Sequence, residues 1–403
     1  MVHAVLVALT MLAGDWPEFR GPGRAGVAEG PPTPMEWSDE TNVAWKVRVP
    51  GLGWSSPVVA DGKVVLTTAV PRGEGLSLRA LAIDAATGDV VWDREAFAVG
   101  QAPSIHPKNS HASPTPVIDG GAVFVHFGAL GTARLALADG AVEWTCNELA
   151  YEPVHGSGGS PILCDGRLVV VCDGRSDPFV AALDARTGRI AWRTPRSVEA
   201  SIRHSFVTPA TATVDGEMQV LAPGPNHMAA YDLATGVERW RVRAPGWSVV
   251  PQPAVGRGLV VYNCDYDRPE LIAVRLGGGV GDVADDHVAW RIKRGAPSTP
   301  SPLMVADELY FVSDNGVASC VSVETGERFW MERIGGNYSA SPIFANGCIL
   351  FLNEDGLATW VERGTDFKVR GRNQVSGRTL ATPAFSDGAM YLRTDEALLK
   401  IAR

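Results

Sequence analysis

The hydrophobic residues of this chain fall in short stretches of about four to six positions, each bounded by turn-forming residues. In the first complete set these stretches cover residues 57–60, 63–68, 78–83 and 90–94. Asp61-Gly62 separates the first two stretches, and Thr87-Gly88 separates the last two. Asp-Gly suits the primed turns of tight hairpins, and Gly reaches positive φ at little cost. The pattern therefore predicts four short antiparallel strands, labelled A to D in chain order.

The turn before the fourth strand belongs to a repeated unit. It reads Asp84-Ala-Ala-Thr-Gly-Asp-Val-Val-Trp92, and close copies end at Trp192, Trp240 and Trp330, with a degenerate copy at Asp139 to Trp144. In the close copies the Trp lies four residues beyond the Gly. A Trp at a fixed position on an outer strand packs against the neighbouring unit. We therefore predict that these Trp residues join adjacent repeats and do not bind ligand.

A second repeated signal starts each set of strands. A Ser or Thr followed by Pro begins strand A in seven sets, and Gln252-Pro253 takes this place in the fifth. Successive copies lie 40 to 59 residues apart. Units of about 40–50 residues that contain several short strands are typical of propeller blades. Eight sets of strands A, B and C can be counted.

The last set predicts how the ring closes. Residues 384–401 end the chain without a D strand, whereas Asn42 to Val49 forms a Trp-bearing strand with no partners before it. Pairing these two segments would remove both open sheet edges. The sequence thus predicts an all-β fold, an eight-bladed β-propeller of four-stranded blades, in which an N-terminal strand completes the last blade.

Two insertions are placed by the repeat. Phe97 to Ser110 lies between strand D of the first blade and strand A of the second, and Gly277 to Asp286 lies between strands C and D of the fifth. In a propeller the D–A and B–C connections share one face, which we call the mouth face. The first insertion is therefore expected to cover the mouth face, and the second to lie on the opposite face.

Composition narrows the possible partners. The formal charge of −9 leaves a nucleic acid to be held only by a local basic patch, so we expect no nucleic-acid partner. Six cysteines show no Cys-x-x-Cys and no adjacent pair, which favours free thiols. We expect a monomer that binds a protein or a polar small molecule.

The N-terminus indicates export. Residues 1–13 contain an apolar run of secretory length and are predicted to be a signal peptide, too short to span a bilayer. Residues 14–41 are predicted to form an extended arm, and residues 42–403 a single propeller domain. No later segment is predicted to cross a membrane. The expected location is extracytoplasmic, in the periplasm or cell envelope.

The channel at the centre of the mouth face is the predicted binding site, because the segments that enter the innermost strands converge there. The candidate residues are Trp54, His111, His155, Arg203, His204, Trp247, Asn337, Tyr338 and Arg378. Among them Trp54, Trp247 and Tyr338 would be aromatic anchors, and Arg203, His204 and Arg378 polar contacts. No His pair has the local spacing of a metal site, and no metal ligand or catalytic residue is assigned.

These repeats resemble those of the pyrroloquinoline quinone (PQQ)-type propellers, a group that includes quinoprotein alcohol dehydrogenases and BamB-like scaffolds. The start, Asp15-Trp-Pro-Glu-Phe-Arg-Gly-Pro, resembles that of secreted bacterial proteins with such repeats. In the dehydrogenases the resemblance implies a quinone held between a Trp floor and a vicinal disulfide, with calcium and a catalytic Asp. This chain has no Cys-Cys pair.

Two functions follow from this resemblance. We expect a non-catalytic scaffold or binding protein of the cell envelope, which recognises a protein or polar ligand on its mouth face and needs no cofactor. The alternative is a PQQ- or metal-dependent oxidoreductase that uses the same face, with calcium and with Asp173, Asp265 or Asp314 as base.

Overall fold

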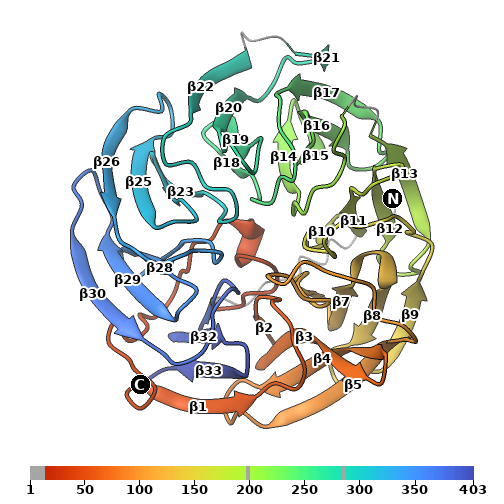
Figure 1. Ribbon diagram of the computed structural model, residues 1–403, viewed down its shortest axis with the longest axis vertical. Helices are drawn as coiled ribbons and strands as arrows, with labels where there is room; N and C mark the ends of the chain where they lie inside the picture. The colour runs from red at the N-terminus through yellow and green to blue at the C-terminus, as the bar shows by residue number, and fades with distance from the viewer. Residues whose placement is uncertain (1–13, 197–199, 284–286) are drawn as a thin grey trace, which may run out of the picture.

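Eight antiparallel sheets are arranged around a central axis (Figure 1). The computed structural model describes residues 14–196, 200–283 and 287–403. Each sheet has its strands in the order A to D, and the fourth also carries a short fifth strand. The predicted eight-bladed propeller of four-stranded blades is confirmed.

The first four blades occupy the chain from β2 to β17. Their strands are β2 (Val58–Ala60), β3 (Lys63–Arg72), β4 (Gly75–Asp84) and β5 (Val90–Val99); β6 (Val117–Asp119), β7 (Ala122–His126), β8 (Thr132–Ala136) and β9 (Val142–Cys146); β10 (Ile162–Cys164), β11 (Arg167–Cys172), β12 (Phe179–Asp184) and β13 (Ile190–Pro195); and β14 (Ala210–Val214), β15 (Glu217–Gly224), β16 (His227–Asp232) and β17 (Glu238–Arg243).

The remaining four blades follow in chain order. Their strands are β18 (Ala254–Gly256), β19 (Leu259–Asn263), β20 (Leu271–Arg275) and β22 (Val288–Ile292); β23 (Leu303–Val305), β24 (Glu308–Val312), β25 (Val317–Ser322) and β26 (Arg328–Arg333); β27 (Ile343–Ala345), β28 (Cys348–Leu352), β29 (Leu357–Glu362) and β30 (Val369–Gln374); and β31 (Ala384–Ser386), β32 (Ala389–Arg393), β33 (Ala397–Ile401) and β1 (Val43–Arg48). The helical elements of the described chain are two short 3-10 helices, η1 (Pro22–Arg24) and η2 (Gly128–Leu130).

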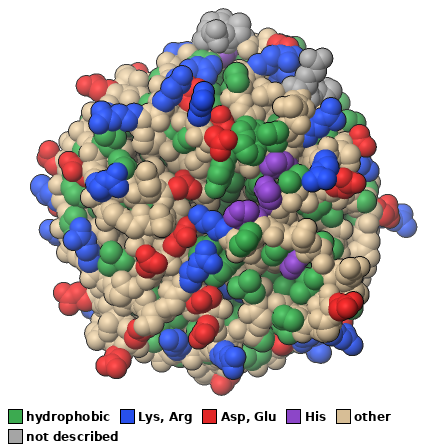
Figure 2. All heavy atoms as spheres, viewed as in Figure 1, with side chains coloured by type: hydrophobic (Ala, Val, Ile, Leu, Met, Phe, Trp, Pro, Cys, Tyr) green, Lys and Arg blue, Asp and Glu red, His purple; other side chains and the backbone are tan. Residues whose placement is uncertain are grey.

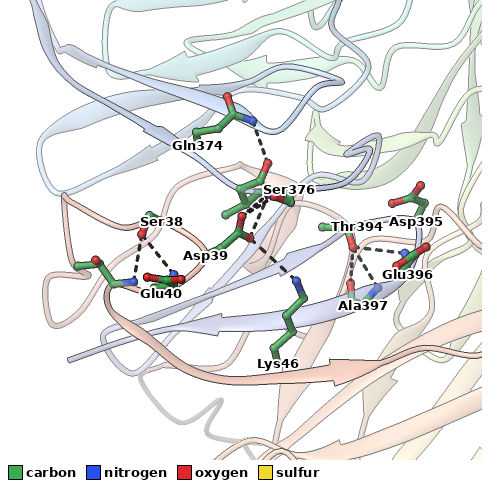
Figure 3. A network of polar contacts seen from close by, with 12 residues as sticks. Ser38, Asp39, Glu40, Lys46, Gln374, Ser376, Thr394, Asp395, Glu396 and Ala397 are labelled. Atoms are coloured by element: carbon green, nitrogen blue, oxygen red, sulfur yellow. Dashed lines mark hydrogen bonds and ion pairs between the residues drawn. The ribbon is translucent and has the colours of Figure 1, made fainter.

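The N-terminal strand closes the ring as the sequence predicted. β1 pairs antiparallel with β33, from Val43 opposite Ile401 to Arg48 opposite Ala397. Close to this pairing, Asp39 accepts hydrogen bonds from the amide and hydroxyl of Ser376, which follows β30 in the neighbouring blade (Figure 3). β1 and the three C-terminal strands thus form one four-stranded blade, and the outer edge of β33 is paired.

The repeated Trp residues join adjacent blades, as predicted. The indole N–H of Trp92 donates to the carbonyl of Leu137 in the next blade at 3.0 Å, and Trp192 donates to Leu233 at 2.9 Å. The ring of Trp192 lies over Gly236, where an added Cβ would be 2.5 Å from the indole. The Gly of the Thr-Gly turn is therefore needed twice, for its positive φ and for the space that the Trp occupies.

The fourth blade shows what happens when the next turn is missing. The second insertion takes the place of the Thr-Gly turn, and part of it forms β21 (Gly281–Asp282), which pairs parallel with β17. Trp240 accordingly donates to the side chain of Gln219 in its own blade, at 2.9 Å. The insertion replaces one inter-blade contact with another.

The Ser or Thr before each Pro has a structural role that the sequence did not reveal. In six places a backbone N–H of one blade donates to the hydroxyl of the next, at 2.9 to 3.0 Å. The accepting hydroxyls, which we call the hydroxyl ring, belong to Thr115, Ser160, Thr208, Ser301, Ser341 and Thr382. They bind the innermost strands to one another around the channel.

The segment before β1 crosses the face opposite the mouth. Trp16 pairs with Val59 of the first blade, and Ala28 donates to Phe344 of the seventh. Between these points η1 lies at the centre of the ring in Figure 1, and Arg24 bonds Glu18 and Thr211. Because Phe19 reaches the central cavity, this segment closes one end of the channel.

The first blade is longer than predicted. β3, β4 and β5 each extend to ten residues, so that Val99 still pairs with Leu76. The first insertion, predicted to start at Phe97, begins after Val99. The reason is a tight turn at Gly73 (φ 62°), which lets the β3–β4 hairpin continue and gives β5 an edge to follow.

Candidate functional site

A cavity of about 310 Å³ occupies the central channel. Residues from the insertion, the N-terminal segment and the starts of most blades form its wall. They include Phe19, Trp54, His106, Lys108, His155, Phe206, Thr208, Trp247, Tyr266, Asp267 and the rest of the hydroxyl ring. The cavity has the size of a small-molecule site or of a pocket for part of a larger ligand.

Two Trp residues stand at opposite sides of the cavity. Trp54 precedes the first blade and Trp247 precedes the fifth, which is four blades away in a ring of eight. Trp54 is 9% exposed, and its indole N–H has no hydrogen-bond partner among the described residues. The guanidinium of Arg378 lies 5.7 Å from the Trp54 ring centre, within cation–π range.

A row of three histidines leads to Trp247. The ring centres of His106 and His155 are 5.4 Å apart, those of His155 and His204 are 5.3 Å apart, and His204 meets Trp247 edge-on at 5.7 Å. Figure 2 shows His side chains beside the centre of the face, next to hydrophobic side chains. The row comes from the first insertion and from the starts of the third and fourth blades.

Burial keeps two members of this row, His155 and His204, neutral. It lowers the pKa of His155, with a smaller contribution from His106, and lowers the pKa of His204 to about 4, with smaller contributions from His155 and Arg175. Both imidazoles are therefore uncharged at neutral pH. The Nε2 atom of His204 is buried and has no partner within the described chain.

The first insertion spans the mouth, in agreement with its predicted place. Asn109 donates from its side-chain amide to the carbonyl of His155 at 2.8 Å, which ties the insertion to the third blade. On the other side of the mouth, the Nζ atom of Lys108 lies 2.7 Å from Oε1 of Glu354 in the seventh blade. Burial raises the pKa of Glu354, but hydrogen bonds from Lys108 and Ser339 outweigh it, so that the pKa is lowered. Glu354 is thus a carboxylate paired with Lys108 at neutral pH.

The structure brings some of the predicted site residues together. Trp54, His155 and Trp247 line the cavity, His204 packs against Trp247, and Arg378 covers Trp54. Phe19, His106 and Phe206 also line the cavity and were not among the predicted site residues. The repeat places the insertion over the mouth face but does not fix the direction of its side chains, and it gives the N-terminal segment no position. Phe206 lies just before the fourth blade, where its aromatic ring was the available signal.

The other predicted residues lie elsewhere. His111 is half-buried, Asn337 is exposed, and Arg203 is exposed with its Nε bonded to the Ala200 carbonyl. Tyr338 is fully buried in a hydrophobic cluster with Trp330 and Ile334. Because apolar side chains surround its ring in the core, Tyr338 is not available to contact a ligand.

The carboxylates of the oxidoreductase alternative are used by the fold. Asp173 is buried against Arg196, with 3.5 Å between its Oδ1 and the arginine Nε, and accepts a hydrogen bond from Ser205. Asp314 accepts from the amides of Ser298 and Thr299 at 2.7 and 3.1 Å. The carboxylate of Asp265 accepts a hydrogen bond from the backbone amide of Asp267. Asp267, and not Asp265, is the one residue with a carboxylate among the described residues of the cavity wall.

The cavity does not fit the quinone and calcium arrangement of the dehydrogenases. The six cysteines are free thiols, and none lines the cavity. Within residues 14–196, 200–283 and 287–403, no cluster of three or more His, Cys, Asp or Glu side chains is placed to hold a metal ion. A single wall carboxylate cannot supply the several oxygen ligands that calcium prefers.

In the described part of the chain, none of the helices has the length and apolar character needed to cross a bilayer.

Comparison with known proteins identifies relatives of more than half of the chain. The family model for outer membrane protein assembly factor BamB matches residues 17–156 and 147–366. The outer membrane protein assembly factor BamB of Moranella endobia is 23% identical over 279 residues, which are 68% of this chain and 65% of that protein. The Shewanella oneidensis protein of the same name is 23% identical over 52% of each chain. The chain therefore matches only about half to two thirds of the length of these relatives.

Solved structures share the fold at low sequence identity. BamB from Moraxella catarrhalis has a TM-score of 0.61 and 13% identity, covering 89% of this chain and 99% of its own. Quinohemoprotein alcohol dehydrogenase from Comamonas testosteroni has a TM-score of 0.67 and 11% identity, covering 96% and 80%. At such identities the likeness concerns the fold alone. Since the family model covers more than half of its residues, the chain belongs to the BamB family of outer membrane protein assembly factors, whose repeats form a PQQ-like β-propeller.

Proposed function

We propose that this chain is a non-catalytic propeller of the cell envelope that binds a partner at its mouth face. The observation that carries this proposal is the make-up of the cavity. Its wall has aromatic side chains on opposite sides, the neutral His155 and one carboxylate, Asp267, among the described residues. Such a wall suits binding through apolar area and hydrogen bonds, whereas hydrolysis or proton transfer needs convergent acids and bases.

The location rests on two supports. The relatives are named as assembly factors for outer membrane proteins, and we extend an envelope location and a protein-binding scaffold role from them to this chain. The apolar run of the predicted signal peptide, residues 1–13, agrees with export but lies outside the described residues. The partner is a protein of the envelope or a polar ligand.

Capture of partners from solubilised cell envelopes tests the binding face. The bait is the full chain, compared with Trp54→Ala and Trp247→Ala, and recovery is measured by quantitative mass spectrometry. Phe329→Ala is the matched control, because Phe329 is an aromatic side chain that is 38% exposed on β26, away from the cavity. We expect partner recovery to fall in both Trp variants and not in the control. Equal recovery with all four baits would remove the mouth face from the proposal.

The oxidoreductase alternative shares its fold, and at these identities only its fold, with two dehydrogenases. The TM-scores are 0.67 for the Comamonas enzyme and 0.69 for a europium-containing methanol dehydrogenase, which is 11% identical over 94% of this chain and 89% of its own. Titration with PQQ and calcium, followed by absorbance and by dye-coupled alcohol oxidation, separates the two functions. Stoichiometric binding with turnover would overturn the non-catalytic proposal.

A further inference from the structure

The hydroxyl ring has hydrogen-bonding capacity that the fold does not use. Each of its six hydroxyl oxygens accepts one backbone N–H from the preceding blade. Within the described chain none of the six donates its own proton to a protein acceptor. A hydroxyl has one donor and two acceptor lone pairs, so one donor and one lone pair stay free at each position. All six side chains line the cavity although the residues are at most 5% exposed.

The walls above the hydroxyl ring are apolar and face one another. Trp54 and Trp247 stand four blades apart, and Phe206 packs beside His155 and His204 near Trp247. The buried indole N–H of Trp54 is a further donor without a partner in the described residues. A ligand in this space would therefore meet flat apolar surfaces at its sides and hydrogen-bonding groups at its end.

The cavity gives little support to a charged ligand. Lys108 is paired with Glu354, His155 and His204 are neutral, and Arg378 is placed over the Trp54 ring near the same Glu354. Asp267 is exposed at the rim. An anionic ligand would lose its hydration without gaining a free cation in the wall, and a cationic ligand would meet a carboxylate only at the exposed rim.

Phe19 sets the depth of the site. It comes from the N-terminal segment that crosses the opposite face, and it forms part of the wall of the cavity. The channel is thus blind at that end. The site accepts the end of a ligand, or a side group of it, and does not thread a chain through the propeller.

We propose that the cavity binds an uncharged saccharide, such as the non-reducing end of a neutral glycan. This inference rests on the proposed function and names its ligand class. The two C–H faces of a sugar ring are apolar and pack against indole rings, and its hydroxyls both donate and accept. That combination matches the Trp54 and Trp247 walls and the hydroxyl ring, whose members can both donate and accept hydrogen bonds. A peptide segment is the competing occupant, and the experiment distinguishes the two.

Isothermal titration of the full chain tests the ligand class. The probes are neutral trisaccharides of glucose (α- and β-linked), mannose, galactose and N-acetylglucosamine, with trigalacturonate as an anionic comparator and an acetylated, amidated Gly-Trp-Gly peptide as the competing occupant. We expect saturable binding of at least one neutral trisaccharide at millimolar or lower concentration, and no binding of trigalacturonate or the peptide. Absence of binding across the neutral set, or binding of the peptide alone, overturns the inference.

Variants connect the binding to the cavity. Trp247→Ala removes one wall, and Thr208→Val removes one hydroxyl of the ring at nearly constant volume, so each is expected to weaken binding by about tenfold or more. Phe329→Ala is the control and should bind as the parent does, and Thr208→Ser, which keeps the hydroxyl, should bind more tightly than Thr208→Val. Thermal melting confirms that each variant is folded. Sugar binding that survives either Trp247→Ala or Thr208→Val overturns the inference.

The outcome separates this inference from the function on which it rests. Partner capture that depends on Trp54 and Trp247, together with no sugar binding, removes the saccharide and keeps the binding propeller. Sugar binding together with equal capture by all four baits keeps the saccharide site and removes the protein scaffold.

Discussion

The rings of Trp45 and Tyr391 lie 5.8 Å apart, although 346 positions separate them in the chain. Trp45 is on β1 and Tyr391 on β32, two strands away in the same blade, and the β33 residue opposite Trp45 is Lys400. The indole N–H of Trp45 also donates to Ala85 of the first blade at 3.3 Å. One side chain thus connects the last blade, the N-terminal strand and the first blade.

Removing this side chain should weaken the closure of the ring. We expect Trp45→Ala to lower the free energy of unfolding by about 3 kcal/mol, the lower part of the range for loss of a large aromatic side chain, because Trp45 is only partly buried. Trp45→Phe should cost less, since it keeps the ring contact. Urea denaturation followed by circular dichroism measures both. A Trp45→Ala protein as stable as the parent would show that β1 contributes little to closure.

A pair of glycines isolates the packing of Trp against the Thr-Gly turn. Gly188 and Gly166 have φ values of 72° and 70°, but an added Cβ lies 2.6 Å from Trp144 at Gly188 and meets nothing within 4 Å at Gly166. Both Ala variants carry the cost of positive φ, about 1 kcal/mol. Gly188→Ala should lose more, by roughly a further 1–3 kcal/mol for overpacking. Equal losses in denaturant titration would mean that Trp144 moves aside freely.

The Asp39 contact of Figure 3 should make closure sensitive to acid. Hydrogen bonds from Ser376 lower the pKa of Asp39 in the folded protein. A lowered folded-state pKa gives stability that is complete above the unfolded value, about 4, and that is lost as the pH falls through the folded value. The loss in the free energy of unfolding should stay below about 1 kcal/mol, because the Asp39 side chain is exposed to solvent.

Asp39→Asn tests this effect. The variant should lose the extra stability at neutral pH and approach the parent in acid, as measured by denaturant titration between neutral pH and pH 3. A constant difference between parent and Asp39→Asn at all pH values would contradict the assigned protonation effect.

The Lys108 to Glu354 contact should hold the first insertion across the mouth. We expect Lys108→Ala to raise hydrogen exchange of the backbone amides in residues 100–110, while the melting temperature changes little, because the pair joins a connecting segment to the rim of the sheets. Hydrogen exchange with mass spectrometry gives both the local and the distant rates. Arg363→Ala, which breaks an ion pair with Glu308 elsewhere, is the matched control. If hydrogen exchange in residues 100–110 does not change in Lys108→Ala, the Asn109 contacts alone hold the insertion in place.

The sequence by itself determined the fold because the signals for it are local and repeated. Each Thr-Gly turn, each Trp four residues later and each Ser-Pro or Thr-Pro start carries the same physical requirement, so the repeated copies give one consistent answer. The missing last strand and the single early one then left one way to close the sheet. The packing of the Trp residues between adjacent blades followed from their fixed position on strand D.

The tertiary structure alone decided the composition of the site. Phe19 and His106 belong to segments outside the repeat, and only the folded ring places them in one cavity with Trp54 and Trp247. Tyr338 shows the reverse, since its place at the start of a blade looked like that of Trp54, but the surrounding apolar side chains bury it fully. A periodic sequence fixes where a strand begins, whereas the direction and exposure of a side chain at that point depend on neighbours that are distant in the chain.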